Sequence, residues 1–185
     1  MPLSPPAPRK HLHTRRYHFE GFQRGDGLFD IEGRITDTKT YGFANDFRGQ
    51  IGPEEPIHDM QVRLTLDFDF VIRDIEATTN AGPYGICGDI APNYRKMIGE
   101  RIKSGWAQRI KALFGRTHGC THISEMLVAM GTVAFQTMWS SQAQRPPEDS
   151  TKKPAHLDSC HALATDGDIV KRFYPQFYTG GRSSS

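Results

Sequence analysis

The feature that most constrains the fold is a long alternation of apolar and polar residues between positions 60 and 72. Every second position there carries a large apolar side chain, at Met60, Val62, Leu64, Leu66, Phe68, Phe70 and Ile72. Side chains of a β-strand point alternately to its two faces, so this period of two predicts a long strand with one apolar face. Such a face must be covered, and we expect helices later in the chain to cover it.

A second alternation predicts a neighbouring strand within residues 27–42. Its apolar positions are Phe29, Ile31 and Ile35. The loop between the two predicted strands, residues 45–56, is short and rich in glycine and proline, which favours antiparallel pairing. Residues 17–23 and 72–79 are candidates for one or two further strands.

Segments with helical spacing follow the strands. Apolar residues recur every three or four positions over residues 94–113 and again over 123–139, and a short helix is expected over 157–164. Strands followed by helices predict an α+β fold. We expect an antiparallel sheet of three to four strands that is covered on one face by the C-terminal helices.

The composition of the chain ends predicts the domain organisation. Four prolines within residues 1–10 predict a flexible N-terminal arm, and residues 179–185 predict a disordered tail. We therefore expect a single α+β domain over residues 11–178 with a polar linker near 140–155. A formal net charge of +2 argues against a dedicated nucleic-acid-binding protein. No apolar run approaches the ~20 residues that a membrane span requires.

Each of the three cysteines stands close to another potential metal ligand. The pairs are Cys87 with Asp89, Cys120 with His122, and Cys160 with His161. An odd number of cysteines fits a reducing compartment, and no secretory signal is visible, so we expect a cytoplasmic protein. Cys120 falls at the start of a predicted helix, where the helix dipole stabilises a thiolate, so it is a candidate ligand or nucleophile. A buried structural cysteine is the alternative for each of the three.

The cysteines are far apart in the sequence, so a shared site must be assembled from separate loops. Their spacing differs from that of zinc fingers, whose ligands come in close pairs. Thiolates combined with an imidazole and a carboxylate suit zinc or an iron–sulfur cluster. The sequence therefore predicts a metal site as one possibility, with an unknown metal.

Polar residues of the strand predicted at 27–42 form a second candidate site. Asp30, Glu32 and Arg34 lie close together, with Asp26, Asp37 and Lys39 nearby. A polar sheet face with cross-strand ion pairs is one interpretation, and a binding site for a small ligand is the other. Placed beside Cys120 and His122, these residues would complete a metal- or cysteine-dependent active site.

Two basic segments also allow two interpretations each. Residues 11–18 are either a solvated arm or an arm that folds over an anion or an acidic partner. Residues 95–116 are either a solvated helix face or a docking surface for an acidic protein. The sequence leaves the partner and the oligomeric state undetermined.

The arrangement of the cysteines resembles that of the NifU/IscU-type iron–sulfur scaffold family and its SufE relatives. The shared features are Cys-Gly-Asp after a sheet, Gly-Cys at the head of a helix, and a late Cys with an adjacent His. This resemblance implies a zinc or iron–sulfur site and transfer to a protein partner, with the ligands Cys87, Asp89, Cys120, Cys160 and His161. The scaffold family places His before Cys whereas here it follows, so His122 is a rival ligand.

A more extensive resemblance is to the bacterial family DUF2889. It is carried by the run 24–33, by Asp37-Thr38-Lys39, by Gly119-Cys120-Thr121-His122 and by Cys160-His161. This resemblance spans most of residues 10–178 and implies a small α+β domain without implying an activity. Two functions are therefore carried forward: a metal-binding scaffold, and a small-molecule enzyme of lyase or hydrolase type.

Overall fold

The computed structural model describes residues 2–143 and 152–180. The chain divides into two compact units, residues 1–143 and 144–185, which are described separately. The boundary falls inside the linker predicted at 140–155. The predicted sheet and the helix predicted over 123–139 lie in the first unit, and the single domain expected over 11–178 stays a prediction. The part of the predicted tail from residue 181 onward lies outside the described residues.

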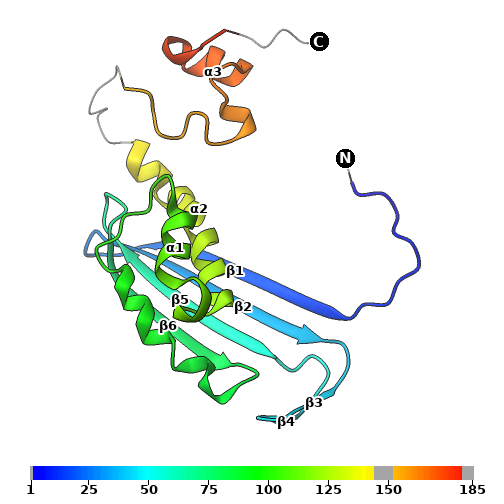
Figure 1. The fold of residues 1–185 in the computed structure, drawn as a ribbon. Helices are drawn as coiled ribbons and strands as arrows, with labels where there is room; N and C mark the ends of the chain where they lie inside the picture. Colours follow the sequence, from blue (N-terminus) through cyan, green and yellow to red (C-terminus); the bar gives the residue numbers. More distant parts are fainter. Residues whose placement is uncertain (1, 144–151, 181–185) are drawn as a thin grey trace. The chain divides into compact units, whose positions relative to one another are not determined.

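The first unit is built on a four-stranded antiparallel sheet with the strand order β1-β2-β5-β6 (Figure 1). Its strands are β1 (His13–Gln23), β2 (Phe29–Lys39), β5 (His58–Leu66) and β6 (Ile72–Ala81). A small hairpin of β3 (Phe43–Asn45) and β4 (Gly49–Ile51) occupies the loop between β2 and β5. The antiparallel sheet and the α+β class predicted from the sequence are confirmed.

The long alternation at positions 60–72 forms two strands, where the sequence pattern predicted one. Asp67 makes the turn between them, because its Oδ1 accepts hydrogen bonds from the backbone N–H groups of Asp69 and Val71, both at 2.9 Å. Phe70 has a left-handed backbone conformation with φ 62°. The apolar alternation continues through this turn because Phe68 and Phe70 both pack against the core.

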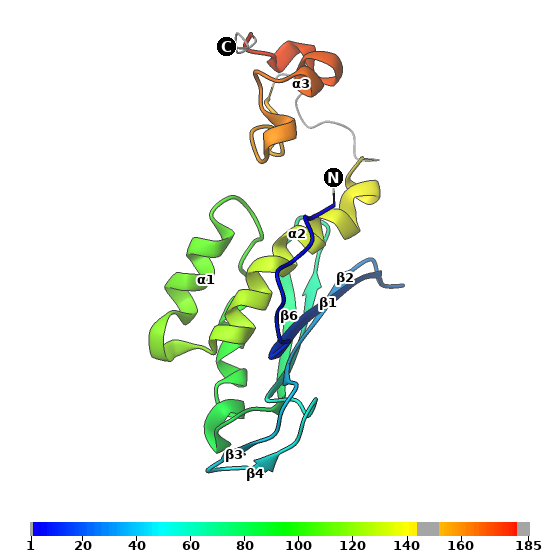
Figure 2. The same ribbon diagram turned by 90° about the vertical axis from the view of Figure 1, so that its right-hand side faces the viewer.

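Helices cover one face of the sheet, as predicted (Figure 2). The longest is α2 (Thr121–Ala143), which crosses β1, β2 and β5. Its apolar stripe is 0% exposed at Ile123, Met126, Leu127, Met130, Ala134 and Met138. Beneath it, the strand register places Ile31 opposite Leu64 and Leu64 opposite Ile75, so that apolar side chains form continuous rows. We call the contact between the apolar stripe of α2 and these rows the apolar seam. Its burial is the main hydrophobic contribution to the stability of the fold.

The helix expected over 94–113 is interrupted. A 3₁₀ segment, η2 (Ala91–Met97), is followed by α1 (Trp106–Phe114). Gly99 and Gly105 lie between them with φ values of 90° and 84°, a backbone region that an α-helix does not use. Arg101 instead forms a β-bridge with Val71 at the edge of the sheet.

The remaining helical elements are short. In the first unit they are η1 (Gly85–Gly88) and η3 (Arg116–His118), and in the second unit η4 (His161–Leu163), α3 (Asp168–Phe173) and η5 (Pro175–Phe177). The helix predicted over 157–164 is thus a single 3₁₀ turn. No helix within the described ranges has the length and apolar character needed to cross a bilayer.

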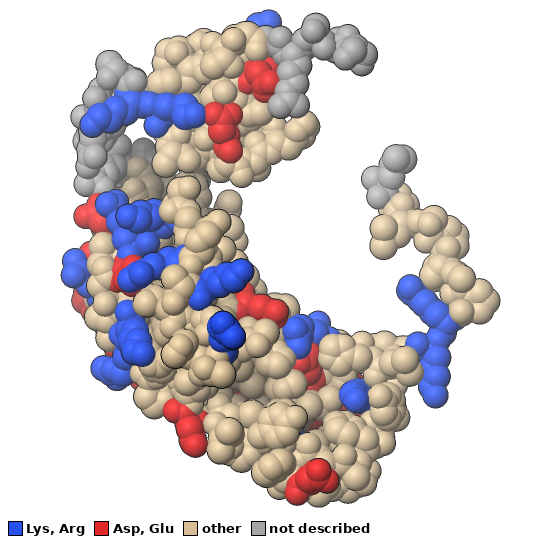
Figure 3. Space-filling view, viewed as in Figure 1, with Lys and Arg blue, Asp and Glu red and all other residues tan. Residues whose placement is uncertain are grey.

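Basic side chains gather over η2 and α1 (Figure 3). All seven are exposed, at Arg95, Lys96, Arg101, Lys103, Arg109, Lys111 and Arg116. The same segment holds one acidic residue, Glu100, which pairs with Arg109. These cations therefore face solvent, and both interpretations of the basic segment remain open.

A close approach between β1 and α2 gives a test of this packing. A Cβ atom added at Gly21 would lie 1.8 Å from Oγ1 and 2.7 Å from Cβ of Thr137. No rotamer of Thr137 removes the second contact, so the helix must move. We expect Gly21→Ala to lower the free energy of unfolding by about 1–3 kcal/mol in urea titrations. Gly25→Ala is the matched control, since a Cβ there meets nothing within 4 Å, and an equal loss in both variants would contradict the packing argument.

Candidate metal centre

The register of the sheet places Asp37 between Arg15 of β1 and His58 of β5. Residues directly opposite each other on antiparallel strands point to the same face. Asp37 shares its face with Ile31 and Ile35, so its carboxylate lies on the side covered by α2. Its side chain is 3% exposed. A row of three polar residues therefore crosses the covered face at the end of β2.

Both oxygens of the Asp37 carboxylate are engaged. Oδ1 accepts a hydrogen bond from Arg15 Nε at 2.8 Å and lies 3.1 Å from His13 Nε2. Oδ2 accepts from Arg15 Nη2 at 2.8 Å and lies 3.0 Å from His58 Nδ1. His122, in the first turn of α2, brings its Nε2 to 3.4 Å from the same Oδ2. One carboxylate thus collects an arginine and three histidines from two other strands and a helix.

The charge states of this cluster follow from burial and from Arg15. Burial alone would raise the pKa of Asp37, but the hydrogen bonds and the positive charge of Arg15 outweigh it and hold that pKa at about 2. Burial lowers the pKa of His58, and this effect exceeds the attraction of Asp37. Burial also lowers the pKa of His122, with further lowering by His58 and Arg15. At neutral pH the carboxylate is therefore ionised and both imidazoles are neutral.

Asp37, His58 and His122 have the geometry of a metal-ligand set. One ligand atom from each lies within 4.8 Å of the other two. In a tetrahedral site with bonds near 2 Å the ligand atoms are ~3.3 Å apart. The distances of 3.0 and 3.4 Å from Asp37 Oδ2 to the two imidazole nitrogens agree with this spacing. The imidazole rings of His58 and His122 face each other at a tilt, with centroids 3.9 Å apart and planes 33° from parallel.

Contacts around the set fix its orientation. Arg15 Nη1 donates to Glu125 Oε2 at 3.3 Å, and the hydroxyl of Tyr17 donates to the same oxygen at 3.1 Å. Cys120 Sγ lies 3.9 Å from the second ring nitrogen of His122, Nδ1. The hydroxyl of the fully buried Tyr94 accepts from the backbone N–H of Cys120 and donates to its carbonyl oxygen. The first turn of α2, and with it His122, is therefore anchored.

The cysteines predicted as ligands belong to three different segments of the chain. Cys87 is partly buried in η1, Cys120 is partly buried at the head of α2, and Cys160 is exposed in the second unit. Asp89 and His161 are both exposed. The ligand-spaced group found within the described residues contains no cysteine. A site made of Cys87, Asp89, Cys120, Cys160 and His161 stays a prediction.

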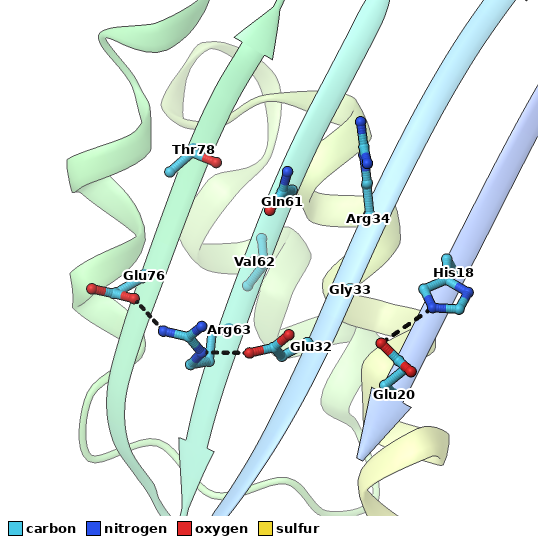
Figure 4. A pocket seen from close by; sticks show the side chains of 10 residues that line it. All are labelled: His18, Glu20, Glu32, Gly33, Arg34, Gln61, Val62, Arg63, Glu76 and Thr78. Carbon is cyan, nitrogen blue, oxygen red and sulfur yellow. Dashed lines mark hydrogen bonds and ion pairs between the residues drawn. The ribbon is translucent and has the colours of Figure 1, made fainter. Parts of the chain in front are cut away.

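Glu32 and Arg34 lie on the open face of the sheet (Figure 4), and Asp30 shares that face because it alternates with the buried residues of β2 in the same way. Glu32 accepts a hydrogen bond from Arg63 at 2.7 Å, and Arg34 donates one to Asp59 at 2.8 Å. Both bonds join β2 to β5. Asp30 accepts from the hydroxyl of Thr65 at 2.7 Å. Glu32 and Arg34 line a shallow hollow of about 260 Å³. The polar sheet face with cross-strand ion pairs is the interpretation that the contacts match.

The sheet separates this polar face from Cys120 and His122. His122 lies in the first turn of α2 and Cys120 directly precedes that helix, and α2 packs on the opposite face. The active site predicted from Cys120, His122, Asp30, Glu32 and Arg34 is therefore not assembled. Only its Cys120–His122 part is brought together.

The sequence pattern groups Asp37 with the polar residues of β2 and gives no prediction for His58, although a signal for both as ligands is present. Asp37 continues the apolar positions of Phe29, Ile31 and Ile35, and His58 precedes Met60 in the same way. A polar side chain on the buried face of a strand must be hydrogen-bonded to another polar group or have a function. His13 and Arg15 were assigned to a basic arm, whereas they belong to the edge strand β1.

Comparison with known proteins gives a family and no activity. A family model described as "Protein of unknown function (DUF2889)" matches residues 13–136. This range contains the sheet, both larger helices of the first unit except the end of α2, and all residues of the Asp37 cluster. Neither the curated proteins nor the solved structures include a match to the chain.

The lowered histidine pKa values predict a dependence of stability on pH. In the unfolded chain a histidine titrates near its usual pKa of ~6.5. The folded state holds His58 and His122 neutral to lower pH. Below pH ~6.5 the unfolded state therefore binds more protons, and stability falls as the pH falls. Asp37 adds a further loss only below pH ~4, because its folded pKa is about 2.

We expect the free energy of unfolding, measured in EDTA, to decrease between pH 7.5 and 5 by at most about 1.4 kcal/mol per pH unit for each histidine. His58→Gln should flatten this slope. His118→Gln, which changes an exposed imidazole, should leave it unchanged. A slope that is identical in the parent protein and in His58→Gln would show that His58 is not held neutral.

Proposed function

The chain belongs to the DUF2889 family, and we propose that it binds a divalent transition-metal ion through Asp37, His58 and His122. The observation that carries this proposal is the convergence of one carboxylate oxygen and two imidazole nitrogens from β2, β5 and α2 at ligand spacing. Metal ligands must be deprotonated, and burial favours the neutral imidazoles while Arg15 favours the ionised carboxylate.

The donor set favours zinc or ferrous iron. Two imidazoles and one carboxylate form the ligand set of catalytic zinc sites and of non-haem Fe²⁺ sites. Calcium and magnesium prefer all-oxygen surroundings, which two histidines do not supply. Three protein ligands leave at least one coordination position for water or substrate, which is the arrangement of catalytic sites rather than of structural ones.

The activity that best suits this centre is metal-dependent hydrolysis of a small molecule. A bound ion lowers the pKa of its water toward neutrality and polarises a substrate carbonyl or phosphoryl oxygen. The chain's own residues would hold the ion, orient the carboxylate through Arg15, and orient His122 through its contact with Cys120. This is the enzyme alternative of the sequence analysis, with ligands different from those first expected.

The scaffold proposal uses other residues and can be separated from this one. It requires sulfur ligation by Cys87, Cys120 and Cys160, with Asp89 and His161. Support for it comes from the NifU/IscU-like order of the cysteines and from the three unpaired thiols, which also suit a reducing, cytoplasmic setting. The Asp37 centre needs no sulfur, so cysteine variants distinguish the two proposals.

We expect the purified protein, incubated with Zn²⁺ and dialysed, to retain about one ion per chain by elemental analysis. His58→Ala and His122→Ala should each reduce the occupancy at limiting Zn²⁺ by tenfold or more, because one of three ligands is lost. His118→Ala is the matched control, since it removes a nearby imidazole that is exposed and lies outside the cluster.

A second comparison uses Cys87→Ser and Cys160→Ser. Full metal retention in both, with loss in the histidine variants, supports the Asp37 centre. Loss of metal in the cysteine variants alone would support the scaffold proposal instead. Circular dichroism of each variant checks that the fold is kept.

A further inference from the structure

We propose that the open position of the metal centre binds an oxyanion, a carboxylate or phosphate group of a small substrate, and that Arg15 binds a second oxygen of that group. This inference rests on the metal centre proposed above and names the class of substrate that the centre would accept.

The more exposed side chains of the cluster belong to β1. The side chains of Asp37, His58 and His122 are 3%, 19% and 17% exposed. Those of Arg15 and His13, in contrast, are 34% and 46% exposed. β1 is the outer strand of the sheet, with β2 on one side of it. A molecule that approaches the buried ligands from the side of β1 therefore meets the guanidinium of Arg15 and the imidazole of His13 first.

Arg15 has donors to spare. A guanidinium carries five N–H groups. Three of them donate to carboxylates, two to Asp37 and one to Glu125, and the Tyr17 hydroxyl also interacts with the guanidinium, which leaves at least one N–H group for a ligand. Nη2 lies 2.8 Å from Asp37 Oδ2, which is the oxygen that would hold the ion. An oxygen bound to the ion would lie ~3.3 Å from Oδ2 on an edge of the coordination tetrahedron. A second oxygen of the same group would then come within reach of the remaining N–H groups.

The charge of the loaded centre favours an anion. The ligand imidazoles are neutral when they bind a metal. The two charges of the ion and the one of Arg15 then exceed the charges of Asp37 and Glu125 by one. Inside a partly buried site this excess is screened less than in water. A carboxylate or phosphate restores the balance, whereas a cationic group would increase the repulsion.

Arg15 is also held in place before a ligand arrives. Its two hydrogen bonds to Asp37 fix the plane of the guanidinium. Glu125, which also accepts a hydrogen bond from the Tyr17 hydroxyl, fixes Nη1 of Arg15. Arginine is suited to such a role, because its planar donors match the geometry of carboxylates and phosphates. A donor that is already oriented loses little conformational entropy when the ligand binds.

The test uses the full chain loaded with Co²⁺, whose visible absorption reports changes in its ligands. Inorganic phosphate and acetate are titrated separately, with chloride at equal ionic strength as the reference. We expect a saturable spectral change with at least one of the two oxyanions and none with chloride. Phosphate acting alone would assign phosphoryl substrates, and acetate acting alone would assign carboxylates.

Arg15→Gln should weaken oxyanion binding by about tenfold or more, because a charge-assisted donor pair is lost. Arg16→Gln is the matched control and should bind as the parent does, since Arg16 lies opposite Thr36 on the other face of the sheet. Co²⁺ that binds without any response to either oxyanion would overturn this inference and leave the metal centre standing. Failure of Co²⁺ itself to bind would instead remove the metal centre.

Glu125→Gln gives a second variant in case Arg15→Gln does not fold. Glu125 is 49% exposed, so its replacement leaves the core intact. It removes a negative charge beside Arg15 while the amide oxygen of the new side chain can still accept from Arg15 Nη1, so phosphate should bind at least as tightly as to the parent. Weaker binding in Glu125→Gln, or equal binding in Arg15→Gln and the parent, would overturn the role of Arg15.

Discussion

Burial of one ionised carboxylate, that of Asp37, is the constraint on which the site depends. A charge at 3% exposure is costly unless it is paired and hydrogen-bonded. Its partners come from β1, β5 and α2, so the register of two strand pairs and the placement of a helix must all be correct at once. The apolar seam between α2 and the sheet fixes those placements, and the polar cluster sits where the seam ends.

The protonation states of these residues suit metal binding as well as a structural network. A structural ion pair would be strongest with protonated imidazoles facing the carboxylate. Burial instead lowers the pKa of His58 and His122, which leaves them neutral beside an ionised Asp37. Arg15 supplies a positive charge beside Asp37. Neutral imidazoles next to a carboxylate are the state that a metal ion requires, and perturbed groups of this kind cluster at functional sites.

The two faces of the sheet have different roles. On the open face, the charged residues of β2 are paired with those of β5 in short, solvent-exposed bridges, such as Glu32 with Arg63. Such bridges contribute little to stability individually, and they keep a half-covered sheet soluble on that side. The covered face holds the core and, at its edge, the candidate metal centre. Asp30, Glu32 and Arg34, which the sequence groups with Asp37, therefore lie on the opposite face of the sheet from it.

The sequence by itself determined a strand within residues 27–42, the apolar alternation that starts at position 60, the apolar stripe of α2 and the α+β class, because periodicity is a local property of the chain. It also placed Cys120 and His122 correctly at the head of a helix. Only the tertiary structure decided that Asp37, His58 and His122 meet and that Asp30 and Glu32 face away from them. Strand register and helix placement depend on contacts between residues 20 to 110 positions apart. A shift of one residue along β2 moves a carboxylate from one face of the sheet to the other.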